Sequence, residues 1–309
     1  MRLSVIICCH NSRTDYLARV LDALKGQTFP KDSWELVVVD NASESLLAES
    51  HNISWHPNAR HVREENLGLT CARLRGIAES TADLILFVDD DNVLGTDYLA
   101  TAVRLLQDLP WLGAIGGQTI PEYEVPPPKW LDRYERLLAI RYLKRARWSN
   151  AVDDWDSQPW GAGMAVRRSV CEIYVKNLSK GFDRRAFDRK GSRLTSAGDI
   201  DLVLGCLDAG LGFGTFPELV VTHLIPERRM TEEYIAKITR ALIASNLLLS
   251  HVRGDPIQLS EPPSLYTHLR GLYHFMKRSS VDRRYAAAVE AGQQDFQAML
   301  EFQKQTHTH

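Results

Sequence analysis

The sequence predicts an α/β fold in which a mostly parallel, partly mixed sheet is flanked by helices and followed by a helical appendage. Three observations indicate this fold class. Short β-branched runs alternate with amphipathic segments near the N-terminus, two apolar strands end in carboxylates, and only helical spacing follows Pro226. Because open α/β sheets bind ligands beyond the carboxyl ends of their strands, we expect a nucleotide to bind there.

The N-terminal half is predicted to contain four strands and two helices. The strands are expected at 4–8, at 36–39, around Val62 and at 84–88. The helices are expected at 70–78 and around Leu17, Val20, Leu21 and Leu24, which repeat at helical spacing behind a polar start. The runs 36–39 and 84–88 are continuously apolar, which is typical of strands covered on both faces.

The second half is predicted to begin with a proline-rich surface loop over 121–129 and an amphipathic helix over 130–142. A strand over 160–166, a helix over 201–209 and a strand over 219–221, ending at His223, follow it. The appendage is expected to consist of helices over 231–253, 264–277 and 281–303. We therefore divide the chain into a main domain, 1–225, and a helical region, 226–309.

Composition excludes several classes of protein. With 37 Lys and Arg against 39 Asp and Glu, the net charge of -2 offers no basic field for a nucleic acid. The five cysteines are scattered without a CxxC pair, which indicates reduced thiols in a cytoplasmic protein. No apolar run reaches the roughly 20 residues of a membrane span, so membrane contact would be peripheral, at the inner face. A basic patch for it is offered by Lys277, Arg278, Arg283 and Arg284.

Three adjacent carboxylates, Asp89, Asp90 and Asp91, follow the apolar run 84–88. They repel one another unless a cation or hydrogen-bond donors offset their charge. Mg²⁺ or Mn²⁺ prefers such hard oxygen ligands, and commonly binds one or two carboxylates together with the oxygens of a diphosphate. The alternative is a solvated acidic turn capped by Asn92, but the strand context favours a metal.

Two further strand ends carry polar groups. Asp40 ends the strand in VVVDNAS, where its carboxylate can accept the ring N–H of uracil or guanine. An Asx turn with the residues that follow has about equal weight. Asn66 and Gly68, followed by Arg73, combine a turn glycine with an arginine one helical turn later, which suits a diphosphate or a base.

Other residues are candidates for contacts with sugar or diphosphate. Trp160, beside Gly161 and Gly163, is suited to stack on a sugar ring, or is a core aromatic next to a bend. Arg228 and Arg229 lie in a segment expected to be mobile and able to close on the diphosphate, although exposed arginines usually face solvent.

Over about residues 3–235, the chain resembles family 2 glycosyltransferases of the GT-A fold. The resemblance rests on the order and spacing of SVIICCHN, WELVVVDNAS, REENLGLTCARLRGI, LILFVDDDN, WGAGMAV, AGDIDLVLGCLDAG and THLIPERRMT. It implies a Rossmann-like nucleotide-binding half at 1–120 and an acceptor-binding half at 121–225. By this resemblance Asp40 would bind the base beside His10 and Asn11.

The resemblance also implies which residues bind the metal and which residue is the catalytic base. The metal motif falls on Asp89 and Asp91, with Asp90 between them, and His223 would complete the metal site. In the motif that ends in Asp199 and Asp201, a glycine stands where glutamate is usual, which concerns acceptor contacts. Asp199 would be the catalytic base and Asp201 would support it. Taken alone, the two aspartates fit equally well as first-turn helix acids, whereas a lone histidine such as His223 is more often a hydrogen-bonded structural residue.

These assignments predict a metal-dependent inverting glycosyltransferase. A metal would stabilise the charge that grows on the leaving diphosphate, while Asp199 takes the proton of an acceptor hydroxyl on the opposite face of the sugar. We favour UDP as the nucleotide and a hydroxyl of a glycan, polysaccharide or lipid-linked saccharide as the acceptor. The C-terminal helices are expected to shape the acceptor side or a homo-oligomer contact.

Two rival functions differ from this expectation. A sugar nucleotidyltransferase carries a GxGTR-like loop after the first strand, where this chain has CCHNSRTD. A catalytically silent nucleotide-, sugar- or Ca²⁺-binding module would bind its ligand without depending on Asp199 for turnover.

Overall fold

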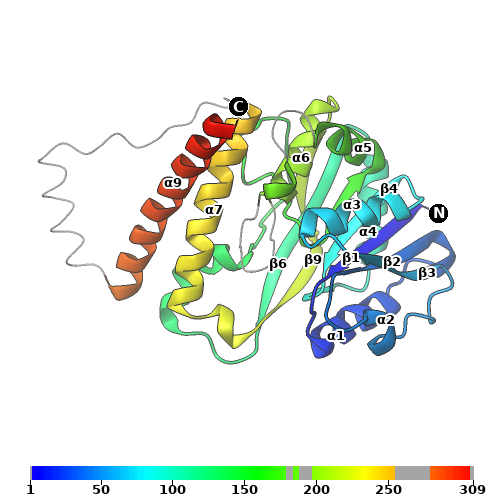
Figure 1. Cartoon of the computed structure of the whole chain (residues 1–309). Coiled ribbons are helices and arrows are strands. Elements are labelled where there is room, and N and C mark those ends of the chain that lie inside the picture. Colours follow the sequence, from blue (N-terminus) through cyan, green and yellow to red (C-terminus); the bar gives the residue numbers. More distant parts are fainter. Residues whose placement is uncertain (1, 179–183, 188–196, 255–278, 307–309) are drawn as a thin grey trace, which may run out of the picture.

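The computed structural model describes residues 2–178, 184–187, 197–254 and 279–306, with side chains up to 301 (Figure 1). Within these residues, a nine-stranded sheet has the order β3-β2-β1-β4-β8-β6-β9-β5, and β7 pairs with β9. The predicted fold class, a mostly parallel mixed sheet flanked by helices, is confirmed.

The four strands predicted in the N-terminal half are present and mutually parallel. Their bounds are β1 (Leu3–Cys9), β2 (Trp34–Asn41), β3 (Ala59–Glu64) and β4 (Leu84–Asp89). In their register, Cys9 lies opposite Asp40 and Cys8 lies opposite Asp89. The carboxyl ends of these strands therefore meet at one edge of the sheet.

Helices cover both faces of the sheet because successive strand residues point to opposite sides. In β1, Val5 and Ile7 join the core formed with α1 (Thr14–Lys25) and α4 (Tyr98–Asp108). The residue between them, Ile6, joins the core on the other face. That core includes residues of α3 (Leu69–Glu79), α5 (Arg168–Asn177) and α6 (Gly198–Asp208). The sequence analysis identified α3 and α6 but not α4. The short elements α2 (Leu47–Ser50), η1 (Lys31–Ser33) and η4 (Arg184–Phe187) complete this part.

The other half of the sheet is mixed. β8 (Met164–Arg167) lies antiparallel between β4 and β6 (Leu112–Tyr123), and β9 (Gly212–Ile225) runs parallel to β6. β5 (Asn92–Leu94) and β7 (Arg147–Ser149) are antiparallel to β9. The strand predicted at 219–221 is part of β9, which continues beyond His223.

The predicted helix over 130–142 is wrong. The chain forms two short 3-10 helices, η2 (Lys129–Arg133) and η3 (Glu135–Leu138), and Ala139 then takes a left-handed φ of 58°. This turn lets Arg141 exchange backbone hydrogen bonds of 3.1 and 2.9 Å with Thr119. A continuous helix cannot make that pairing, because its backbone groups bond within the helix.

Two long helices, α7 (Glu232–Arg253) and α9 (Ser280–Thr306), lie side by side along one end of the molecule (Figure 1). η5 (Glu227–Arg229) joins β9 to α7. The helix predicted over 264–277, and Lys277 and Arg278 of the predicted basic patch, lie outside the described residues. In the same patch, Arg284 forms an ion pair with Glu232, with Nε 3.3 Å from Oε2.

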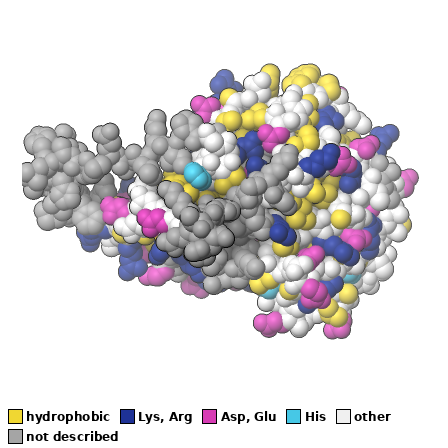
Figure 2. Space-filling view, turned by 45° about the horizontal axis from the view of Figure 1, so that its top comes forward, with side chains coloured by type: hydrophobic (Ala, Val, Ile, Leu, Met, Phe, Trp, Pro, Cys, Tyr) yellow, Lys and Arg dark blue, Asp and Glu magenta, His cyan; other side chains and the backbone are white. Residues whose placement is uncertain are grey.

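The surface carries charges of both signs. On the face shown in Figure 2, Lys and Arg side chains are interspersed with Asp and Glu side chains. None of the helices in the described ranges combines the length and apolar character that crossing a bilayer requires.

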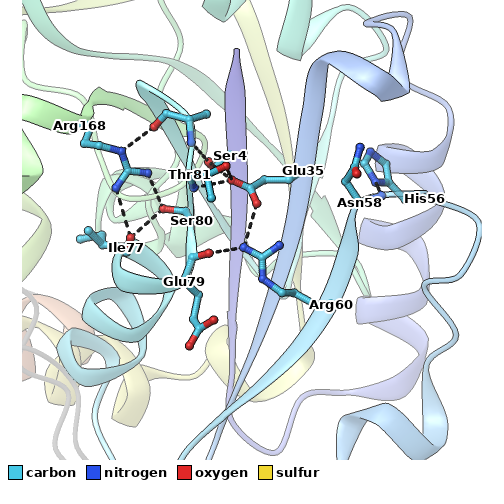
Figure 3. A network of polar contacts seen from close by, with 11 residues as sticks. Ser4, Glu35, His56, Asn58, Arg60, Ile77, Glu79, Ser80, Thr81 and Arg168 are labelled. Atoms are coloured by element: carbon cyan, nitrogen blue, oxygen red, sulfur yellow. Dashed lines mark hydrogen bonds and ion pairs between the residues drawn. The ribbon is translucent and has the colours of Figure 1, made fainter. Parts of the chain in front are cut away.

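A buried carboxylate joins several strands at their amino ends, away from the predicted site (Figure 3). Glu35 accepts hydrogen bonds from Ser4 Oγ at 2.7 Å and from Thr81 N at 2.6 Å, and forms an ion pair of 2.8 Å with Arg60. Burial alone would raise the pKa of Glu35, but these donors lower it to about 2. Glu35 therefore stays ionised and ties β1, β2 and β3 to the start of β4.

Candidate active site

A cleft of about 1360 Å³ opens at the carboxyl ends of β1 and β4 and beside the last part of β9. Most of the residues predicted to bind substrate lie on its wall. They are His10, Asn11, Gly68, Arg73, Asp89, Asp90, Asp91, Trp160, Gly161, Asp199, His223, Arg228 and Arg229. Asp40, Asn66, Gly163 and Asp201 do not line it.

Asp91 and His223 converge in space, as predicted. Nε2 of His223 lies 3.5 Å from Oδ2 of Asp91, and both side chains are almost fully buried. The pairing of β5 with β9 places Asn92 opposite His223, and the Asn92 amide donates a 2.9 Å hydrogen bond to Asp91 Oδ1. The sheet itself therefore brings these distant parts of the sequence together.

The orientation of His223 suits a metal ligand. Its Nδ1 lies 3.0 Å from the carbonyl oxygen of Leu138, which can only accept, so Nδ1 carries the proton. Nε2 then keeps its lone pair, which accepts the N–H of Arg229 Nη1 at 3.0 Å beside Asp91 and is the electron pair that an imidazole offers to a metal. No cluster of three His, Cys, Asp or Glu ligands is found in the described residues. One carboxylate and one imidazole nevertheless fit Mg²⁺ or Mn²⁺, which often complete their coordination with phosphate oxygens and water.

The acidic triplet is electrostatically crowded. Burial first, and then the neighbouring Asp91 and Asp89, raise the pKa of Asp90 to about 7. Asn92 also donates to Asp89 Oδ2 at 3.3 Å. The neighbouring carboxylates therefore oppose ionisation of Asp90, and positive charge beside the triplet would relieve the repulsion between its members.

Asp199 is held by two backbone N–H groups. Gly161 N donates to its Oδ2 at 3.0 Å, and Ile200 N donates to its Oδ1 at 2.9 Å. A Cβ on residue 161 would lie 2.8 Å from Nη2 of the buried Arg73 and 3.3 Å from Asp199 Oδ2, so a larger residue there would displace one or both of these groups. The carboxylate is thus oriented at the cleft wall, next to a buried guanidinium.

Trp160 stacks on an arginine in this structure. The guanidinium of Arg141 lies 3.7 Å from the centre of the indole ring, and its Nη1 donates to Gln158 O at 2.7 Å. Burial lowers the pKa of Arg141 to about 10, which still leaves it charged. Arg141 therefore supports the segment that carries Trp160 and Gly161, and a sugar contact by Trp160 stays a prediction.

The part of the cleft where the base of the nucleotide was expected to bind differs from the prediction. Asp40 accepts N–H groups of Ser43 and Leu47, both at 3.2 Å, and pairs with Arg63 at 2.9 Å. Burial opposes these contacts, but together they lower the pKa of Asp40. The N–H of Ser43 lies three residues after Asp40, one residue beyond that of an Asx turn, so Asp40 is bound by the residues that follow it but not in an Asx turn. Asn66 is exposed.

Asn41 lines the cleft beside these residues, although the sequence analysis did not select it. Its Oδ1 accepts the N–H of Gly68 at 2.8 Å, and its carbonyl oxygen lies 2.8 Å from Nδ1 of His10. Gly68 has φ of 147°, a value that favours glycine, so the predicted turn glycine is present. The sequence could have indicated Asn41, because it follows Asp40 directly and polar residues at the carboxyl end of a strand lie at the binding edge of the sheet.

Gly163 and Asp201, which were expected beside the sugar and beside the catalytic base, do not line the cleft. Gly163 lies behind the cleft, where its carbonyl oxygen accepts a 2.6 Å hydrogen bond from Tyr98. Asp201 has no exposed surface and forms ion pairs with Arg184 at 2.8 Å and with Arg253 at 3.5 Å. These pairs join α6 to η4 and to the end of α7, so Asp201 has a structural role.

The two C-terminal helices form a wall of the cleft that the sequence analysis could not assign to particular residues. One stripe of each helix faces the cleft, made by Ile238, Leu242 and Asn246 of α7 and by Asp282, Tyr285, Ala286, Val289, Glu290 and Gln293 of α9. Residues three and four positions apart share a helix face, which explains the stripes. The same spacing is expected of any core-facing helix, so it carries no signal for a ligand.

Curated proteins related to this chain are glycosyltransferases. A glucosyl-dolichyl phosphate glucuronosyltransferase of Haloferax volcanii is 24% identical over 131 residues, which are 42% of this chain and 42% of that protein. An N-acetylglucosaminyltransferase of Bradyrhizobium diazoefficiens is 31% identical over 231 residues, which are 72% of this chain and 45% of that protein. The chain spans about half the length of these relatives or less.

Solved structures share the fold at low sequence identity. S. aureus TarS 1-349 in complex with UDP-GlcNAc has a TM-score of 0.54 and 14% identity, covering 96% of this chain and 82% of that chain. Mannosyltransferase PcManGT from Pyrobaculum calidifontis, in complex with GDP-Man and Mn²⁺, has a TM-score of 0.54 and 19% identity. The match covers 100% of this chain and 81% of that chain. The glycosyl transferase family 2 profile matches residues 4–173, more than half of the sequence. The chain therefore belongs to glycosyl transferase family 2.

Proposed function

We propose that the protein is a metal-dependent inverting glycosyltransferase that moves a sugar from a nucleoside diphosphate to a hydroxyl of a glycan, polysaccharide or lipid-linked saccharide. The observation that carries this proposal is that Asp199 and the pair Asp91 and His223 line one cleft. A proton acceptor and a cation site on one cleft are what such a transfer needs.

In this proposal Asp91 Oδ2 and His223 Nε2 hold Mg²⁺ or Mn²⁺. The ion supplies positive charge to the diphosphate as it leaves. Binding of GDP-Man with Mn²⁺ by a protein of the same fold supports the proposal. The buried carbonyl of Leu138 keeps the imidazole in the tautomer that binds a metal.

Asp199 acts as the general base in this proposal. Its two oxygens each accept one backbone N–H, which fixes the carboxylate and leaves further lone pairs for a proton. The acceptor hydroxyl gives up its proton to Asp199 as its oxygen attacks the anomeric carbon. Attack from the face opposite the leaving diphosphate inverts that carbon.

We propose UDP as the nucleotide. The name of the Bradyrhizobium relative and the UDP-GlcNAc complex of TarS support this choice. His10, Asn11 and Asn41 lie together at the edge of the cleft where the base is expected. Asp40 would contribute by holding the turn that follows Asn41. Cytoplasmic localisation, peripheral membrane contact and association through the C-terminal helices remain predictions.

The test combines binding and turnover. UDP, GDP, CDP and TDP sugars are screened with and without Mn²⁺ by thermal shift, where a bound ligand raises the melting temperature. The substitution Asp199→Asn is expected to lower turnover of the best donor by about 10²- to 10⁴-fold and to change Mn²⁺-dependent UDP affinity only a few fold.

The matched control is Asp22→Asn, an exposed aspartate of α1 outside the cleft, which should turn over like the wild type. Unchanged turnover in Asp199→Asn contradicts the assigned base. A wild-type protein that binds UDP sugar but transfers nothing to any acceptor favours the binding-module alternative, and no shift with any nucleotide contradicts the proposal as a whole.

A further inference from the structure

We infer that Arg229 fills the space between Asp91 and His223 in the ligand-free protein, so that a divalent ion binds there only when this side chain leaves. The inference rests on the proposed function, because it concerns the same metal site. Arg229 ends η5, directly after β9, and was expected only as a mobile contact to the diphosphate. The structure places it against the acidic triplet.

The geometry is that of a cation shared by two ligands. Nη1 of Arg229 lies 2.9 Å from Oδ2 of Asp91 and 3.0 Å from Nε2 of His223. These are the two atoms that lie 3.5 Å apart and face the proposed metal position. A divalent ion bound to both atoms lies about 2.1 Å from each, in the space that Nη1 fills. Arg229 and the metal therefore exclude each other.

The arginine is built into this position. Its side chain is 16% exposed, and those of Asp91 and His223 are 12% and 8% exposed. Burial alone would lower the pKa of Arg229, but Asp91 raises it above the usual value, so the guanidinium stays charged. In the absence of metal it offsets part of the charge of the triplet. The unliganded site is thus stable without a bound ion.

Displacement leaves the arginine in need of a new partner. The backbone of its segment is held, because Arg229 N donates to Pro226 O and Glu227 N donates to Glu124 Oε2, each at 2.9 Å. The movement is therefore one of the side chain within the cleft. A metal that binds alone leaves a buried guanidinium without its carboxylate, which is costly. A bound diphosphate offers it anionic oxygens at the same time.

In this exchange, the metal takes the place of Arg229 at Asp91 and the diphosphate becomes the new partner of Arg229. The exchange makes metal and nucleotide bind cooperatively. Each ligand improves the site for the other, because the diphosphate receives the arginine that the metal displaces. The protein is expected to bind Mn²⁺ weakly by itself and much more tightly with UDP. Removal of the guanidinium should abolish the part of this coupling that comes from the exchange.

The test measures Mn²⁺ binding by calorimetry, first without nucleotide and then with saturating UDP. Without nucleotide, Arg229→Met is expected to bind Mn²⁺ about tenfold more tightly than the wild type, and the enhancement by UDP should fall by a similar factor. The control is Arg104→Met, which removes the same charge from an exposed residue of α4 outside the cleft and should match the wild type. If Arg229→Met does not fold, Arg229→Gln replaces it.

The outcomes separate the two proposals. If the wild type binds UDP with Mn²⁺ and the substitution of Arg229 leaves the affinity for Mn²⁺ alone unchanged or weaker, the exchange is refuted and the proposed function stands. A gain of the same size in Arg104→Met also refutes it, because general charge would then be the cause. If the wild type binds neither Mn²⁺ nor UDP under any condition, the proposed function fails and the exchange fails with it.

Discussion

The backbone N–H of Gly161 donates a 3.0 Å hydrogen bond to Oδ2 of Asp199, so the residue after Trp160 orients the proposed base. A Cβ at position 161 would lie 2.8 Å from Arg73 Nη2 and 3.3 Å from Asp199 Oδ2. We expect Gly161→Ala to lower kcat by about 10²-fold, because the carboxylate must shift away from its position. Steady-state kinetics with the best donor measure the effect.

The control for this substitution is a second glycine of the helix that carries Asp199. A Cβ at Gly205 would meet Val170 Cγ1 at 3.5 Å, an ordinary contact. Gly205→Ala should therefore leave kcat unchanged and stabilise the fold by about 0.5–1 kcal/mol, the usual gain of alanine over glycine in a helix. An equal loss of kcat in both variants would show general damage to α6 and not displacement of the base.

Removal of the arginine beneath Trp160 should weaken the fold around the cleft. Arg141→Met loses the stacking at 3.7 Å and leaves the carbonyl of Gln158 without its donor. We expect a loss of about 1–3 kcal/mol in the free energy of unfolding, measured by urea titration. Arg136→Met is the comparison, since that guanidinium is 64% exposed and 5.8 Å from the same ring. A loss of equal size in Arg136→Met would speak against the stacked geometry.

The buried ion pairs of Asp201 should dominate the stability of the contact between α6 and α7. Asp201→Asn removes the carboxylate that pairs with Arg184, whose side chain is 11% exposed, and leaves Arg253 with Asp208 alone. We expect a loss of about 3–5 kcal/mol in the free energy of unfolding. Asp208 is the other partner of Arg253, and its side chain is 33% exposed. Asp208→Asn should therefore lower the free energy of unfolding by less than about 1 kcal/mol. Nearly equal losses would contradict a structural role specific to Asp201.

Glu35 should make the fold sensitive to acid. Its pKa is about 2 in the folded protein against 4.5 for an ordinary glutamate, because its donors outweigh the effect of burial. A lowered pKa contributes stability that is complete above pH 4.5 and is lost as the pH falls toward 2. We expect this loss to be on the order of 2 kcal/mol, followed by urea unfolding at several pH values. In Glu35→Gln the dependence over this window should be shallower. An equally steep dependence in the variant would assign the acid sensitivity to other carboxylates.

The sequence was informative where the local pattern decides the structure. Leu84–Asp89 is a strand because its apolar run is continuous, and the carboxylates after it must lie at the sheet edge. The meeting of Asp91 with His223 was expected from the order of the motifs alone. The structure supplies its cause, the pairing of Asn92 with His223 in adjacent strands.

The sequence was misleading where tertiary contacts decide the outcome. Asp199 and Asp201 both lie in the first turn of α6, but two positions correspond to a rotation of about 200°, so one faces the cleft and the other the interior. Which of them is buried depends on Arg184 and Arg253, and no spacing rule identifies such distant partners. The 130–142 segment has helical spacing, yet pairing of Arg141 with Thr119 breaks it.

The wall that α9 contributes also has a consequence for how the protein matures during synthesis. Cys8 and Gln293 border the same cleft, so the first and last described residues of its lining leave the ribosome at opposite ends of translation. The sheet and the acidic triplet can assemble early, while the cleft stays open on one side until α9 arrives and Asp282 accepts the hydrogen bond of the Tyr134 hydroxyl. A product truncated after α7 would thus keep the sheet and the acidic triplet and lose the wall that α9 contributes to the cleft.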